Sequence, residues 1–187
     1  DMLKEKIVNF FRFSYGLFLI SISLFIILSL ATFNIADNSF LVKTSNLNTN
    51  LMGIIGSYIA SFLIYTFGSL SYLTTLFLML YGVLIFLKKN PKYFFIRIFV
   101  FFFGLALTPQ LFIFWAWDYS YYNGLKPWGE IANIIYNLHT SEVLSYTLSF
   151  VGAIFILSSI SIFSLLKFSK SRFSFFQKNI SSEKYKS

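Results

Sequence analysis

The sequence has no cysteine and only one histidine, His139, among its 187 residues. The lack of cysteine excludes disulfides, thiolate metal ligands and a thiol nucleophile. P-loop, GxSxG and HExxH patterns are also missing from the sequence, which removes the common nucleotide-binding, serine-hydrolase and zinc-protease signatures. We therefore expect this chain to hold no catalytic residue, no metal site and no cofactor.

Charge is scarce as well, at 12% of residues, whereas 57% are hydrophobic and the mean hydropathy is +0.71. This composition is typical of an integral membrane protein and not of a soluble domain. A helix of about 20 apolar residues crosses the ~30 Å hydrocarbon core of a bilayer. The apolar runs therefore predict an all-α integral membrane protein with four transmembrane helices, at residues 13–36, 70–87, 94–117 and 143–166.

The apolar run over residues 51–87 is too long for one upright span. Its 37 residues would make a straight helix of roughly 55 Å at ~1.5 Å per residue. We therefore predict a helix over residues 51–66 at the membrane surface, lying flat or dipping inward, then a break at Gly68 and a span over 70–87. Glycine suits a break because it tolerates left-handed backbone angles. The candidate N-caps of the helix over residues 51–66 are Asn46, Asn48, Thr49 and Asn50. A second short amphipathic helix is predicted from the helical spacing of Ile131, Ile134, Ile135 and Leu138.

Basic residues are distributed unevenly over this four-span plan. Both termini and the turn at 88–92 share one side, which holds thirteen of the fifteen Lys and Arg residues, all except Lys43 and Lys126. Positive residues remain cytoplasmic, so we predict that residues 1–12 and the basic tail 167–187 are cytoplasmic and that the short helices are periplasmic. Topology thus accounts for the net charge of +8, and contact with anionic lipid head groups is favoured over contact with nucleic acid.

Small residues form a row near the start of the 51–87 run: Gly53, Gly56, Ser57, Ala60 and Ser61. Their spacing of i, i+3, i+4, i+7 and i+8 places them on one face of a helix. A small-residue face lets helix backbones approach closely, and such packing drives helix association in membranes. Two interpretations stay open, namely packing within one chain and contact between subunits of an oligomer.

Three segments resemble the N-terminal four-span membrane domain of the FtsK/SpoIIIE DNA translocases. The segment "ATFNIADNSF" is similar to the patch that follows the first span in that family. The segment "NTNLMGIIGSYIASFLIYTFGSLSYL" follows the family pattern N-x-x-G-x-x-G-A-x-x-A-D and its later F-G. The segment "GLKPWGEIANIIYNL" is similar to the patch before the fourth span. Besides the small-residue row, the residues that carry the resemblance are Asp37, Ser39, Asn50, Phe67, Gly68 and Gly129.

The sequence departs from the family pattern at three places. Ser57 and Ser61 stand where the family has an alanine and an acidic residue. No proline follows Asp37, and Pro127 and Trp128 replace a usual glycine pair.

The resemblance implies a function that the residues alone do not. Members of the family carry a long linker and then a P-loop motor that pumps DNA at the division septum. This chain would be the membrane anchor and the oligomerisation or localisation domain of such a translocase in the bacterial inner membrane, with residues 167–187 as the start of the linker. It would be either a fragment of a longer translocase or a motor-less FtsK-like division scaffold. The implied partners are membrane lipids, further copies of the chain (a hexamer by analogy), other division proteins, and DNA, ATP and Mg only through a motor domain missing from this chain.

An accessory subunit of a channel or transporter is the alternative from another functional class. Such proteins need a polar path, which intramembrane ionisable residues usually mark. The cores of the four predicted spans contain no Asp, Glu, Lys, Arg or His, which favours an anchor.

Overall fold

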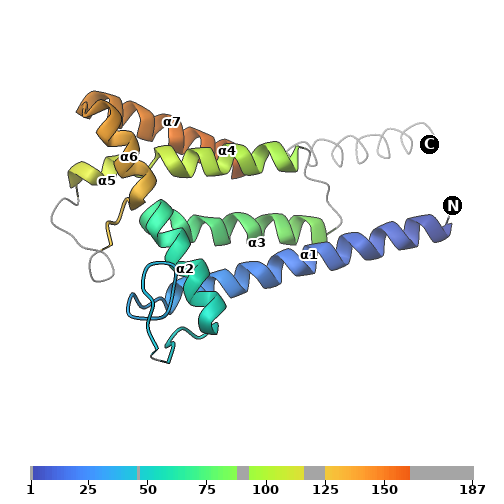
Figure 1. Cartoon of the computed structure of the whole chain (residues 1–187). Coiled ribbons are helices and arrows are strands. Elements are labelled where there is room, and N and C mark those ends of the chain that lie inside the picture. The colour runs from blue at the N-terminus through green and yellow to red at the C-terminus, as the bar shows by residue number, and fades with distance from the viewer. Residues whose placement is uncertain (1, 46, 88–92, 116–124, 161–187) are drawn as a thin grey trace, which may run out of the picture.

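The computed structural model describes residues 2–45, 47–87, 93–115 and 125–160, and each of the elements in these ranges is a helix (Figure 1). Within them, four helical stretches are long and apolar enough to cross a membrane: Glu5–Ala31, Gly53–Phe86, Phe94–Ile113 and Glu142–Ile160. The predicted all-helical, four-span fold is therefore confirmed. The elements in chain order are α1 (Met2–Ala31), α2 (Gly53–Phe67), the 3-10 helix η1 (Gly68–Ser71), α3 (Tyr72–Phe86), α4 (Phe94–Leu107), α5 (Gln110–Trp115), α6 (Gly129–His139) and α7 (Glu142–Ile160).

The first helix has different bounds from the predicted span over 13–36. The predicted span began where the charge-free run begins, whereas helix α1 starts at Met2. Charged residues end an apolar run, but they do not end a helix. It ends at Ala31, where the Asn34 side chain accepts a hydrogen bond from Ala36 N at 3.0 Å and holds a turn instead of a further helical turn. The ends of the predicted spans at 117 and 166, the 88–92 turn and the 167–187 tail lie outside the described residues.

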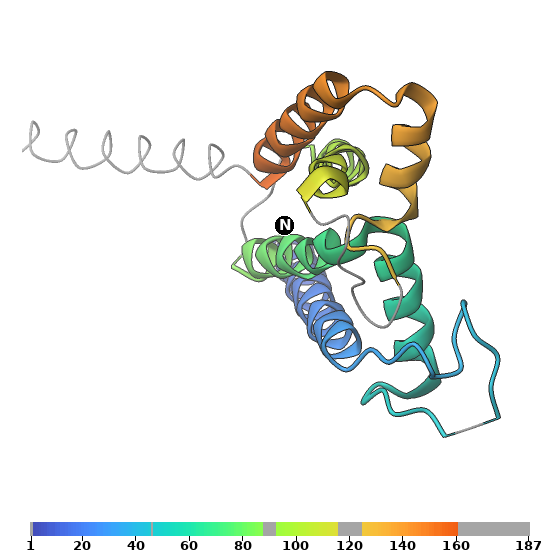
Figure 2. The ribbon, with the colours of Figure 1, turned by 90° about the vertical axis from the view of Figure 1, so that its left-hand side faces the viewer.

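The long helices form two pairs, α1 with α3 and α4 with α7, which lie side by side in both views (Figures 1 and 2). In each pair, a glycine of one helix lies against a glycine of the other. A Cβ on Gly16 would lie 2.9 Å from Gly82 O, and a Cβ on Gly104 would lie 2.8 Å from Gly152 O. Glycine at these positions allows the backbones to touch, which is the packing that stabilises helix pairs in lipid.

Replacing Gly152 by leucine is expected to separate α4 from α7. A Cβ at this position would already lie 2.7 Å from Thr108 N, a backbone atom that cannot swing away. We expect the free energy of unfolding in detergent to fall by about 2–3 kcal/mol, as for other overpacked contacts. Thr147→Leu, on the exposed face of the same helix, is the control and should change stability little. Equal losses in the two variants would contradict the close approach of α4 and α7.

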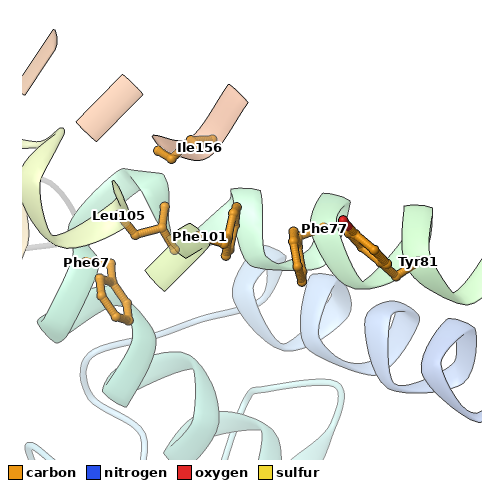
Figure 3. Packing of buried hydrophobic residues seen from close by; sticks show 6 residues of the cluster. All are labelled: Phe67, Phe77, Tyr81, Phe101, Leu105 and Ile156. Carbon is orange, nitrogen blue, oxygen red and sulfur yellow. The ribbon is translucent and has the colours of Figure 1, made fainter. Parts of the chain in front are cut away.

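Aromatic rings join the two helix pairs. Phe77 of α3 stacks on Phe101 of α4, with ring centroids 4.3 Å apart and an interplanar angle of 21°, and Tyr81 packs beside Phe77 (Figure 3). The Tyr81 hydroxyl donates a 2.6 Å hydrogen bond to Ser159 O of α7. The core thus runs across both pairs, through Phe67, Phe77, Tyr81, Phe101, Leu105 and Ile156.

Candidate functional site

The connection between α1 and α2, residues 32–52, is called here the α1–α2 loop. It lies with α2 and α6 at the end of the bundle away from the N-terminus, and this end is called the loop end (Figure 1). Helix α2 runs across the long helices rather than along them, as the first two views show (Figures 1 and 2). The residues that carry the family resemblance therefore gather at one end of the molecule.

Asp37 is the centre of the polar contacts in this loop, although only 2% of its surface is exposed. Its carboxylate accepts hydrogen bonds from Thr49 N at 2.8 Å, Thr49 Oγ1 at 3.0 Å and Asn50 N at 2.9 Å. A buried carboxylate needs such donors to offset its loss of water. Asp37 thereby ties the start of the loop to its end.

Asn50 connects the end of α1 to the start of α2. Its side-chain nitrogen donates to Ser29 O at 2.8 Å and to Thr32 O at 3.3 Å, and its side-chain oxygen accepts from Met52 N at 3.0 Å. The last carbonyls of one helix and the first backbone N–H groups of another lack helical partners. The side-chain amide of Asn50 forms hydrogen bonds with groups of both kinds. The N-cap position itself is occupied by Met52, which makes no side-chain capping bond, so the capping pattern differs from the predicted one.

Asn48 binds the loop to the side of α2. Its side-chain nitrogen donates to Ser57 Oγ at 2.6 Å and to Asn38 O at 3.2 Å, and its oxygen accepts from Asn38 N at 3.1 Å. Ser57 Oγ also lies 2.7 Å from Asn38 O. Ser39 closes a turn of its own, since its Oγ accepts from Leu41 N and Val42 N. The loop is thus held by uncharged hydrogen bonds around the single carboxylate of Asp37.

The small-residue row lies against the same chain in the structure. Gly56, Ser57, Ala60 and Ser61 are all buried. Ala60 packs with Leu30 at the end of α1 and with Phe33 at the start of the α1–α2 loop. A Cβ on Gly56 would lie 2.5 Å from Asn50 Oδ1 and 3.0 Å from Ser29 Oγ. This face of α2 is therefore filled by α1 and the loop.

Gly53 does not belong to that packed face. It has a φ of +65°, and a Cβ there would meet no atom within 4 Å. Gly53 is the first residue of α2, and its backbone is left-handed. The helical spacing assumed a regular helix at this residue and therefore wrongly put it on the packed face. Its role in the structure is conformational.

Gly68 and Gly129 meet where α2 ends and α6 begins. Both have positive φ, +61° and +75°, and a Cβ on Gly129 would lie 2.5 Å from Gly68 N. Ser69 donates to Pro127 O from its backbone N at 2.8 Å and from its Oγ at 3.0 Å. The predicted break after Phe67 is thus also a contact point between the two halves of the chain.

The side chains of the loop end hold the backbone of the α1–α2 loop, α2 and α6 in place through hydrogen bonds and packing. Within the described residues, no cluster of three or more His, Asp or Glu side chains lies close enough to hold a metal ion. His139, at the end of α6, accepts from Ser141 N at Nδ1, so its Nε2–H faces Gln110 Oε1 at 3.1 Å. This histidine joins α6 to α5 as a structural contact.

Comparison with known protein families shows which family the chain belongs to. Residues 9–180 match the family model described as the 4TM region of DNA translocase FtsK/SpoIIIE. The chain belongs to this family. No curated protein and no solved structure was found to match it. The 4TM region of FtsK/SpoIIIE is a membrane region and not the motor, and the chain is a multi-pass membrane protein.

Three of the residues that depart from the FtsK/SpoIIIE pattern make local contacts in this 4TM region. Ser57, in place of alanine, supplies the hydroxyl that binds Asn48 and Asn38. Ser61, in place of an acid, donates to Tyr58 O at 2.9 Å and accepts a long 3.4 Å bond from Phe40 N. Trp128 is 5% exposed and packs with Ile113 and Ala132. The altered residues therefore contribute to contacts within this chain.

Several structural residues of this 4TM region carry no signal in the sequence that reveals their partners. Asn48 reaches Ser57 across 9 positions, and Thr32 accepts from Leu51 N across 19. The glycines at the helix crossings have only a weak signal, since each is a lone glycine inside an apolar span: Gly16, Gly82, Gly104 and Gly152.

Proposed function

We propose that this chain anchors an FtsK-like DNA translocase in the bacterial inner membrane and localises it at the division septum. The observation that carries the proposal is the family match over residues 9–180, which spans all four membrane helices. A membrane anchor domain follows from the family directly. The septal location is the further step, and it rests on where translocases of this family work.

The loop end is the surface that we assign to contact with other division proteins. It is tied down by the Asp37, Asn48 and Asn50 side chains, so it presents a fixed shape. Phe40 and Phe62 are exposed there, with ring centroids 6.2 Å apart. Exposed aromatic residues on a rigid support are common centres of protein interfaces.

Copies of the chain would assemble through another surface than the small-residue row, in a homo-oligomer for which the family suggests a hexamer. Apart from Gly53, the row is covered by α1 and the α1–α2 loop of the same chain. DNA, ATP and Mg would be handled by a motor domain joined to this one.

The proposed orientation places the loop end in the periplasm and the N-terminus in the cytoplasm. Single cysteines at Lys43, in the exposed α1–α2 loop, and at Lys6, exposed on α1, test it cleanly because the sequence has no other cysteine. In spheroplasts, a membrane-impermeant maleimide is expected to label Lys43→Cys at once. Lys6→Cys should be labelled only after the membrane is permeabilised. The reverse pattern would overturn the orientation.

A chimera tests the proposed function. Residues 1–187 would replace the membrane domain of an FtsK-type translocase whose loss causes a division defect. We expect the chimera to restore division, whereas an unrelated four-span segment of similar length, joined to the same motor, should not. A chimera that inserts into the membrane at normal abundance and fails to restore division would count against the anchor function.

A further inference from the structure

Helix α2 buries both of its serines and exposes isoleucines. It contains no charged residue, and Ile54, Ile55 and Tyr58 are 57%, 67% and 40% exposed. These three residues are called here the outer face of α2. Phe62 lies further along the helix, in the contact with Phe40 described above. A helix at a water surface has the opposite arrangement, with its polar residues outward, so the outer face does not fit contact with water.

The level of α2 in the membrane follows from its contact with α1. Helix α1 is unbroken, and Arg12 is its last charged residue. The cluster that contains Ile64 of α2 also contains Leu30, with Ile26 packed against it. Ile26 and Leu30 lie 14 and 18 residues after Arg12, which is about 21 and 27 Å along the helix at ~1.5 Å per residue. With Arg12 at the edge of the hydrocarbon, both levels lie within its ~30 Å thickness, and a tilt of α1 would bring them further inside.

Helix α3 gives a similar level by a separate route. Tyr72, its first residue, donates a hydrogen bond from its hydroxyl to Leu30 O at 3.0 Å. Tyr72 lies 15 residues before Leu87, the last residue before the basic segment over residues 88–92, which corresponds to about 22 Å. Helix α2 therefore crosses the long helices at a level inside the hydrocarbon.

The lipid-facing surface of α1 continues onto α2 at this level. Helix α1 spans the membrane, and close to its contact with α2 it exposes Leu24, Ile27 and Leu28. Figure 2 shows α2 at the edge of the group of long helices rather than over its centre. The exposed side chains of α1 and the outer face of α2 thus form one apolar surface.

We propose that α2 lies within the hydrocarbon of the leaflet at the loop end, with its outer face in contact with lipid acyl chains. A second copy of the chain fits this face less well. Helices associate closely in lipid through small residues, because large apolar side chains pack against lipid tails equally well. The small residues Gly56, Ser57, Ala60 and Ser61 are buried on the other side of α2. The proposal rests on the four spans alone, so it stands independently of septal location.

Spin labels on single cysteines test the lipid contact, since the sequence has no other cysteine. The full chain with Ile54→Cys or Ile55→Cys would be labelled and reconstituted in vesicles of phosphatidylethanolamine and phosphatidylglycerol. Electron paramagnetic resonance measures collisions of the label with oxygen, which dissolves in hydrocarbon, and with a polar nickel chelate, which does not. Leu28→Cys, exposed on α1, and Lys43→Cys, exposed in the α1–α2 loop, are the controls for lipid and for water.

Labels on the outer face are expected to behave like the label on α1. Their ratio of oxygen to nickel collisions should lie within about twofold of that at Leu28 and at least about fivefold above that at Lys43, because the polar chelate is excluded from hydrocarbon. A ratio equal to that at Lys43 would place the outer face in water. Few collisions with either reagent, or spin–spin broadening that disappears on dilution with unlabelled chain, would show that protein covers it. Each of these two results would overturn the proposal.

Maleimide labelling tests the same face in cell membranes. A polar maleimide reacts with a thiolate in water, and a thiol in hydrocarbon neither ionises nor meets the reagent. After freeze–thaw, which opens both sides of the membrane to the reagent, Ile55→Cys should react at least about tenfold more slowly than Lys43→Cys. The comparison is therefore independent of the orientation of the chain. Equal rates would contradict burial of the outer face in lipid.

Discussion

Replacing Asp37 by alanine is expected to lower the free energy of unfolding by about 3 kcal/mol, through loss of charge-assisted hydrogen bonds in a buried site. The carboxylate accepts from Thr49 N, Thr49 Oγ1 and Asn50 N, all within 3.0 Å. Its removal leaves two backbone amides without an acceptor, and the α1–α2 loop loses the contact that joins its ends. Unfolding of the purified chain in detergent, followed by circular dichroism, measures the loss.

Two further substitutions separate the role of the carboxylate from a general effect of changing the loop. Asp37→Asn keeps the shape and one oxygen acceptor but brings an NH₂ group toward N–H donors, so an intermediate loss is expected. Lys43→Ala removes an exposed charge from the same loop and should shift stability by less than about 0.5 kcal/mol. If Asp37→Ala were as mild as Lys43→Ala, the carboxylate would not hold the loop.

Replacing Gly129 by alanine is expected to cost more than about 3 kcal/mol, because a left-handed backbone and a backbone clash act together. Gly129 has a φ of +75°, and the added Cβ would lie 2.5 Å from Gly68 N and 2.6 Å from Thr66 O. These are main-chain atoms, so relief requires α2 and α6 to move apart. Thermal unfolding in detergent gives the loss, and faster protease cleavage near Pro127 would report the separation.

Gly53→Ala is the matched control for the backbone part of this cost. Gly53 has a similar φ of +65°, but a Cβ there would meet nothing within 4 Å. It should cost only about 1–2 kcal/mol, the usual penalty for a left-handed non-glycine residue. The difference between the two variants measures the contact between Gly68 and Gly129. Equal costs would mean that this contact contributes nothing.

Hydropathy and length were sufficient to predict the membrane class, the four spans and a break in the long apolar run. These features depend on composition over many residues, so single contacts do not affect them. The break needed only an arithmetic comparison of helix length with bilayer thickness, and Gly68 was the residue best suited to it. In the structure α2 ends at Phe67 and Gly68 has a φ of +61°.

The partners of the loop-end side chains could not be predicted, because each joins segments that are separate in the sequence. Asn50 was a reasonable N-cap candidate, yet its nitrogen bonds to Ser29 O, 21 residues away. Gly53 fitted the helical spacing, but spacing does not reveal that the helix has only begun at that residue. Gly129 stood out only through the family pattern, and its contact with Gly68 needed the folded structure.

Imaging of the chain in dividing cells tests the central claim most directly. Residues 1–187 would carry a fluorescent protein after the C-terminal end, and its intensity at the septum would be compared with that along the side wall, with membrane fractionation as the control for insertion. The anchor function predicts a band at the division site, several-fold brighter than the side wall. A fusion that is inserted in the membrane and spread evenly around the cell would contradict it.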